Sequence, residues 1–62
     1  MKLKIEIKMD NAAFNEADAG IELQRILDRL AGDLAVSDVR AGFSSILHDA
    51  NGNKIGFAKT IK

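Results

Sequence analysis

Apolar and polar residues alternate strictly at the start of the chain. The apolar positions are Leu3, Ile5, Ile7 and Met9, and the polar positions between them are Lys2, Lys4, Glu6 and Lys8. A period of two is that of a β-strand, whose successive side chains point to opposite faces of a sheet. The pattern predicts a strand over residues 2–9 with one buried face and one charged face.

The periodicity changes to that of an α-helix in the middle of the chain. Turn and cap formers fill residues 10–18, where either Asn15 or Asp18 is suited to cap the helix. One stripe, spanning about 100° of arc, then collects Leu23, Ile26, Leu27, Leu30 and Leu34. These positions predict one amphipathic helix from residue 16 or 19 to residue 34. Its other face is expected to be solvated and carries Glu22, Arg25, Asp28, Arg29 and Asp33.

Two further alternating segments flank an Asn-Gly pair. Residues 39–47 alternate, most clearly from residue 43 to residue 48, and Ile55, Phe57 and Ile61 alternate near the end of the chain. Asn51-Gly52 between two apolar-rich segments is the strongest short-range signal for a β-hairpin. In this interpretation the phenylalanines belong to the core, and Gly56 and Ala58 are small residues that face outward.

The predicted fold is an α+β domain covering residues 1–62, with elements in the order β-α-β-β. Right-handed crossovers and the tight hairpin favour a three-stranded antiparallel sheet of order 1-3-2, with the helix packed on one face. A single helix leaves the other sheet face and both edges uncovered. Such surfaces are typical places to dimerise or to bind a partner.

The small size of the chain makes a partner the expected source of additional stability. A domain of 62 residues buries roughly 60% of the surface that its unfolded chain exposes, so its stability is marginal. Small domains are usually supported by disulfides, a metal or oligomerisation. The chain has no cysteine and one histidine, so we predict no metal and no cofactor. We predict instead that the chain forms a homodimer.

Charge is distributed unevenly although the net charge is zero. Residues 1–9 and 54–62 hold six lysines against Glu6, whereas residues 10–53 hold eight acidic residues against three arginines. A neutral total therefore conceals a polarised surface. No apolar segment is long enough for a signal peptide or a membrane span, so we expect a cytoplasmic protein without a membrane partner.

The hairpin contains a spacing that resembles half of a calcium-binding loop. Asp49, Asn51 and Asn53 match positions 1, 3 and 5 of such a loop, but Lys54 occupies the glycine position and Thr60 replaces the bidentate glutamate. Side chains that bond the backbone of their own turn explain these residues better.

The single histidine does not indicate an enzyme. Ser44 lies four residues before His48, which is too far for a nucleophile–base hydrogen bond along an extended strand. No glycine-rich oxyanion loop accompanies the pair. We therefore predict no catalytic residues and a non-enzymatic protein.

The lysines form the most informative candidate surface. In the order 1-3-2, Lys2, Lys4 and Lys8 share the open sheet face with Lys54 and Lys62. We expect a protein partner to bind through this face, an edge strand or the hairpin, and the predicted contact residues are Lys4, Glu6, Lys8, His48 and Lys54. The alternative is a small nucleic-acid-binding regulator that uses the same lysines. Glu6 in the middle of the patch and the assignment of every phenylalanine to the core weigh against it.

Two segments carry a resemblance to known small proteins. The chain contains Met9-Asp10-Asn11-Ala12-Ala13-Phe14 and Asp49-x-Asn51-Gly52-Asn53-x-Ile55-Gly56. With the helix around Ile26-Leu27-Asp28-Arg29-Leu30, these segments resemble uncharacterised proteins of bacteriophages and prophages. The resemblance implies a phage accessory protein in the cytoplasm of the bacterial host. Proteins of that kind commonly bind and block a host protein, including factors of antiviral defence.

Overall fold

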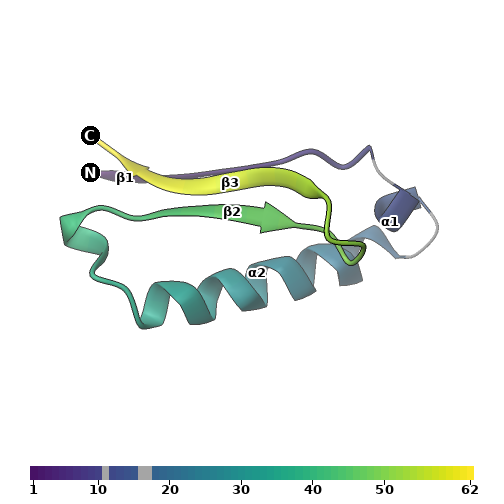
Figure 1. The fold of residues 1–62 in the computed structure, drawn as a ribbon, viewed down its shortest axis with the longest axis horizontal. Coiled ribbons are helices and arrows are strands. Elements are labelled where there is room, and N and C mark those ends of the chain that lie inside the picture. The colour runs from purple at the N-terminus through teal and green to yellow at the C-terminus, as the bar shows by residue number, and fades with distance from the viewer. Residues whose placement is uncertain (11, 16–17) are drawn as a thin grey trace.

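Three strands form one antiparallel sheet in the order β1-β3-β2, with a long helix beneath β2 (Figure 1). The computed structural model describes residues 1–10, 12–15 and 18–62. Its elements are β1 (Lys2–Ile7), α1 (Ala12–Asn15), α2 (Ala19–Ala35), the 3₁₀ turn η1 (Val39–Ala41), β2 (Ser44–His48) and β3 (Lys54–Ile61). The predicted α+β fold and strand order are confirmed.

Asp18 caps α2, which resolves the choice between Asn15 and Asp18. The Asp18 carboxylate accepts a hydrogen bond from the Gly20 N–H at 2.9 Å, so one of the unpaired donors of the first turn is satisfied. Asn15 is instead the last residue of α1. Residues 11, 16 and 17 lie outside the described part of the chain. The alternative helix start at residue 16 is one of these residues. The helix passes Gly32 and ends one residue beyond the predicted Leu34.

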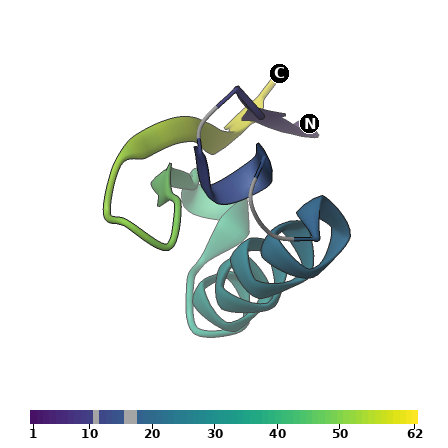
Figure 2. The same cartoon turned by 90° about the vertical axis from the view of Figure 1, so that its right-hand side faces the viewer.

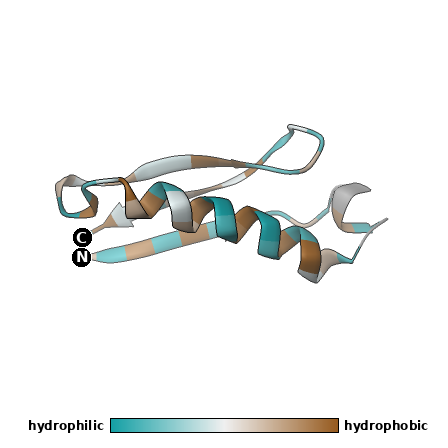
Figure 3. Ribbon diagram, turned by 90° about the horizontal axis from the view of Figure 1, so that it is seen from below, coloured by the Kyte–Doolittle hydropathy of each residue, from teal (hydrophilic) through white to brown (hydrophobic). Residues whose placement is uncertain are grey.

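The helix packs on one face of the sheet, but mainly over β2 (Figure 2). The core between them consists of Phe14, Ile26, Leu30, Leu47, Ile55 and Ala58. Viewed from the helix side, β1 lies beside α2 rather than behind it (Figure 3). Leu3 and Ile5 consequently remain 44% and 42% exposed. The apolar face of β1, which the sequence predicts to be buried, is therefore only partly covered.

A β-bulge in β3 changes which side chains reach the core. Leu47 lies opposite Gly56 and His48 lies opposite Lys54, so Ile55 is an extra residue on β3. Such a bulge interrupts the alternation of side chains along a strand. Ile55 and Ala58 are both buried, at 2% and 0% exposure, although an unbroken strand would place them on opposite faces. The prediction that Ala58 faces outward is therefore wrong.

The remaining differences lie at the ends of elements. Residues 39–41 form the 3₁₀ turn η1 rather than a strand, because the Asp38 side chain caps the turn by accepting from the Ala41 N–H at 3.3 Å. β2 comprises Ser44–His48, which lies within the segment 43–48 that is predicted most clearly. β1 ends at Ile7, two residues before the predicted end, although the Lys8 N–H still donates to the Ile55 carbonyl at 2.8 Å.

The bulge generates a stability prediction at Gly56. A Cβ atom there would lie 1.8 Å from the Glu6 carbonyl oxygen of β1, so Gly56→Ala must displace backbone. We expect the free energy of unfolding to fall by about 3 kcal/mol or more. Gly32→Ala is the matched control, because nothing lies within 4 Å of its added Cβ and alanine favours a helix by about 0.5–1 kcal/mol. Urea unfolding followed by circular dichroism measures both, and equal stability of the two variants would contradict the bulge.

Candidate functional site

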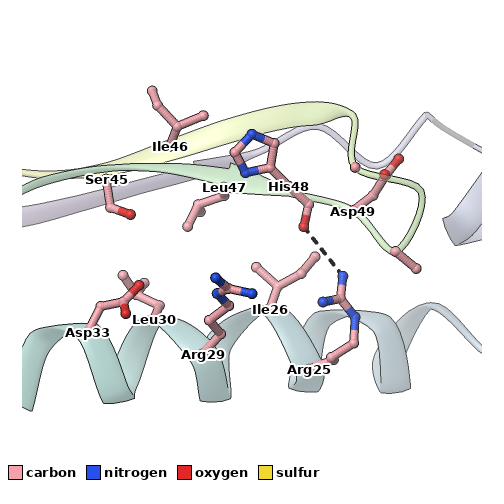
Figure 4. Close-up of a pocket in the computed structure, with 12 residues that line it drawn as sticks. Arg25, Ile26, Arg29, Leu30, Asp33, Ser45, Ile46, Leu47, His48 and Asp49 are labelled. Atoms are coloured by element: carbon pink, nitrogen blue, oxygen red, sulfur yellow. Dashed lines mark hydrogen bonds between the residues drawn. The ribbon is translucent and has the colours of Figure 1, made fainter.

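The sheet face turned away from α2 carries most of the candidate residues. We call it the open sheet face. The pairing register places on it Lys2, Lys4 and Glu6 of β1, Phe57, Lys59 and Ile61 of β3, and Ser44, Ile46 and His48 of β2. Figure 4 shows Ile46 and His48 pointing away from α2, whereas Ser45 and Leu47 point toward it.

Phe57 lies at the centre of the open sheet face between two lysines. The Lys59 Nζ atom is 5.2 Å from the centroid of the Phe57 ring, and the Lys4 Nζ atom is 6.0 Å from it. Both distances fit cation–π contacts, which stabilise by about 0.5–1 kcal/mol at exposed sites. Ile46 is the cross-strand neighbour of Phe57 on β2 and is 46% exposed. The face therefore offers an apolar centre within a basic surround.

The residues predicted from the sequence lie around this ring. A hollow of ≈ 250 Å³ is lined by Glu6, Lys8, Lys54, Ile55, Gly56 and Phe57. Lys4 contacts Phe57, and His48 is the cross-strand partner of Lys54. The structure thus brings the five predicted residues to one region.

Sequence reasoning missed Phe57 and Lys59 as members of this region. It assigned Phe57 to the core because Ile55 and Phe57 are two residues apart. One signal was present, because an isolated glycine inside a strand pattern, here Gly56, is typical of a bulge. A bulge at that point moves Phe57 to the solvent face together with Lys59.

A second concavity, of ≈ 480 Å³, lies between α2 and β2 and is bordered by polar residues of both elements (Figure 4). Arg25 connects the two elements at this groove. Its Nε donates to Glu22 Oε1 at 2.7 Å, and its Nη2 donates to the His48 carbonyl oxygen at 3.4 Å. Glu22 is only 7% exposed, so the prediction of an ordinary solvated helix face is wrong for Glu22. Arg25 holds the end of β2 against the helix.

The hairpin residues that resemble a calcium loop stabilise the turn instead. Asp49 is 4% exposed, and its carboxylate accepts from the backbone N–H groups of Asn51 and Asn53, each at 2.9 Å, and from Asn53 Nδ2 at 3.2 Å. Gly52 supplies the positive φ of 83° that the turn requires. These bonds agree with the interpretation of the segment as turn chemistry.

The described residues contain neither a cluster of metal-ligating side chains nor a membrane-spanning helix. Among residues 1–10, 12–15 and 18–62, no three His, Cys, Asp or Glu side chains gather as metal ligands would. Neither of the helices in that part of the chain is long and apolar enough to cross a membrane.

The half-buried position of Phe57 on the open sheet face generates a second stability prediction. Because its ring lies outside the core, Phe57→Ala should lower the free energy of unfolding by about 1–2 kcal/mol, roughly the two cation–π contacts. Phe14→Ala is the matched control, because Phe14 is buried at 6% exposure and removal of a core phenylalanine costs about 3–5 kcal/mol. Chemical denaturation of both variants gives the comparison. A larger loss for Phe57→Ala than for Phe14→Ala would place Phe57 in the core.

Comparison with known proteins adds no relative to this description. No protein-family model matches the chain, and no curated protein or solved structure is detectably similar to it. Functional inference therefore depends on the geometry and charge of the open sheet face.

Proposed function

We propose that this protein is a non-enzymatic binding protein that docks an acidic protein surface on its open sheet face. The observation that carries the proposal is the position of Phe57, a large aromatic side chain held between Lys4 and Lys59 on a face that no helix covers. Aromatic residues are enriched in the cores of protein interfaces because they bury a large area with few rotatable bonds.

The charge of the face indicates the chemistry of the partner. β1 and β3 are neighbours in the sheet, so the two lysine-rich ends of the sequence lie side by side (Figure 1). Lys2, Lys4, Lys8, Lys54 and Lys59 then surround Glu6, which is the one acidic residue among the residues of these two strands. A concentrated positive patch accelerates association with a negative surface and disfavours basic partners.

The resemblance to small phage proteins extends this proposal to a biological setting. In that setting the protein is a phage accessory protein in the cytoplasm of the bacterial host. Its partner is then a host protein with an acidic surface, and inhibition of an antiviral-defence factor is the function that suits such a small binding protein.

A comparative capture experiment tests the proposal. Tagged wild-type protein and two variants are expressed in infected bacterial cells, and captured proteins are identified by mass spectrometry and then titrated in purified form. The double variant Phe57→Ala with Lys4→Ala removes the aromatic centre and one cation, and we expect it to weaken binding at least about tenfold, as loss of an interface anchor does.

Ile21→Ala is the control, because Ile21 is 65% exposed and lies on α2, away from the open sheet face. It should bind like the wild type. A partner that binds the double variant and the wild type with equal affinity would exclude the open sheet face as the docking surface.

A second candidate function, single-stranded nucleic-acid binding, gains from the position of Phe57. The strongest argument against it was that every phenylalanine belonged to the core. Phe57 is instead partly exposed among lysines, and an aromatic ring in a basic surround can stack on a base. Glu6 beside the ring still opposes a phosphate backbone.

Fluorescence anisotropy with labelled single-stranded DNA and RNA tests the second candidate. If the protein binds nucleic acid, it should bind the labelled strand at low salt, and its affinity should fall steeply between about 50 and 200 mM salt because counterions are released on binding. Phe57→Ala should then weaken binding by about 1–3 kcal/mol, the typical contribution of one stacked base, and Lys59→Ala should flatten the salt dependence. Absence of binding at the lowest salt concentration would remove this candidate.

A further inference from the structure

β1 is an edge strand whose outer edge pairs with no other described strand and whose apolar face is only partly covered. The Lys8 N–H donates toward β3, to the Ile55 carbonyl. Backbone groups of successive residues in a strand point to opposite sides, so the N–H and C=O groups of Leu3, Ile5 and Ile7 point to the free edge. The other edge strand, β2, differs because α2 packs against it and Arg25 bonds its His48 carbonyl.

An exposed apolar side chain also lies on the flank of α2 turned away from the groove with β2. Counting 100° per residue, Arg25 and Arg29 lie on the flank of α2 that borders the groove with β2, and Leu27 lies on the opposite flank. Leu27 is 42% exposed. Leu3 and Ile5 of β1 are exposed to a similar degree.

The chain exposes more surface than a typical monomer of its mass, which agrees with an association surface. A folded monomer of 6.7 kDa exposes about 3,900 Å², whereas this chain exposes 4437 Å². Its radius of gyration is 12.2 Å, against about 10.6 Å for a typical domain of its length. If a dimer buried this excess area of both chains, the interface would cover about 1,000 Å², the minimum expected of a biological interface.

We infer that β1 pairs antiparallel with β1 of a second copy of this chain, around a two-fold axis at Ile5. That register keeps residues 3–7 paired within the strand, with Ile5 opposite Ile5 and Leu3 opposite Ile7. It places Lys4 opposite Glu6 twice, once on each side of the axis. Opposite charges at directly paired positions stabilise a sheet, and like charges destabilise it.

The neighbouring registers place like charges at their centre. An axis at Lys4 also sets Lys2 opposite Glu6 twice, but it places two Lys4 side chains against each other on the axis. An axis at Glu6 places two carboxylates there and sets Lys4 opposite Lys8. With the axis at Ile5, Lys2 faces Lys8 only at the ends of the pairing, where solvent screens them. With the axis at Ile5, the backbone N–H and C=O groups of Leu3, Ile5 and Ile7 in the two copies form about six hydrogen bonds between the chains.

The pairing has a consequence for the open sheet face. The two three-stranded sheets join into one six-stranded sheet with both helices on the same side, because the axis is perpendicular to the sheet. The two open sheet faces then form one continuous surface with a Phe57 from each copy. This dimer does not depend on the identity of any other partner.

Cysteine cross-linking tests the surface directly, because the chain has no cysteine of its own. Under mild oxidation Ile5→Cys should form a disulfide-linked dimer, since paired Cα atoms at about 5.5 Å lie within disulfide range. Ile46→Cys is the matched control on the other edge strand, with 46% exposure against 42% for Ile5, and it should stay monomeric on a denaturing gel. Equal cross-linking of the two variants, or none for Ile5→Cys, overturns the inference.

Charge reversal tests the register. Light scattering coupled to size-exclusion chromatography should give the wild type twice the 6.7 kDa mass of one chain. Lys4→Glu and Glu6→Lys each set like charges against one another at two places and should raise the dimer Kd about tenfold or more, while the combined variant Lys4→Glu with Glu6→Lys should restore the dimer. A wild-type monomer at every concentration, or a combined variant weaker than both single variants, overturns the proposed pairing.

Discussion

The bulge at Ile55 and Gly56 is the constraint on which the rest of the structure depends. It inserts one extra residue into β3 opposite β2 and so reverses the alternation of the strand at that point. Ile55 can then join Leu47 and Ala58 in the core, and Phe57 emerges on the opposite face. Gly56 makes the bulge possible, because a Cβ at this position would enter the backbone of β1. One residue without a side chain thus decides both the core and the open sheet face.

The helix depends on the hairpin for its placement. Asp49 closes the turn with hydrogen bonds to Asn51 and Asn53, and the adjacent His48 carbonyl receives Arg25 from α2. Arg25 is also bonded to the nearly buried Glu22, so this contact adds to the core packing of Ile26 and Leu30 against Leu47. The cost of this arrangement is that β1 keeps an uncovered apolar flank. The open sheet face and the free β1 edge are therefore different surfaces that share Lys4 and Glu6.

The two surfaces suit different kinds of contact. The β1 edge presents backbone groups and a charge pattern that complements itself around Ile5, which favours a second copy of the chain. The open sheet face presents an aromatic ring among lysines, which favours an acidic surface of another molecule. A chain of this size has a small core, so the proposed association at the first surface would add stability and would leave the second surface available for binding.

The sequence by itself determined the local elements: the alternation of β1, the amphipathic stripe of α2, the Asn51-Gly52 turn and, through connection rules, the strand order. These follow from short-range periodicity and turn chemistry, which are properties of neighbouring residues. It also identified Lys4, Glu6, Lys8, His48 and Lys54 as neighbours on one face. Only the tertiary structure decided that Phe57 joins them, that Glu22 is buried and that β1 lacks cover. The physical reason is that a bulge and the position of a helix over a sheet are set by packing between distant segments, which periodicity along the chain does not record.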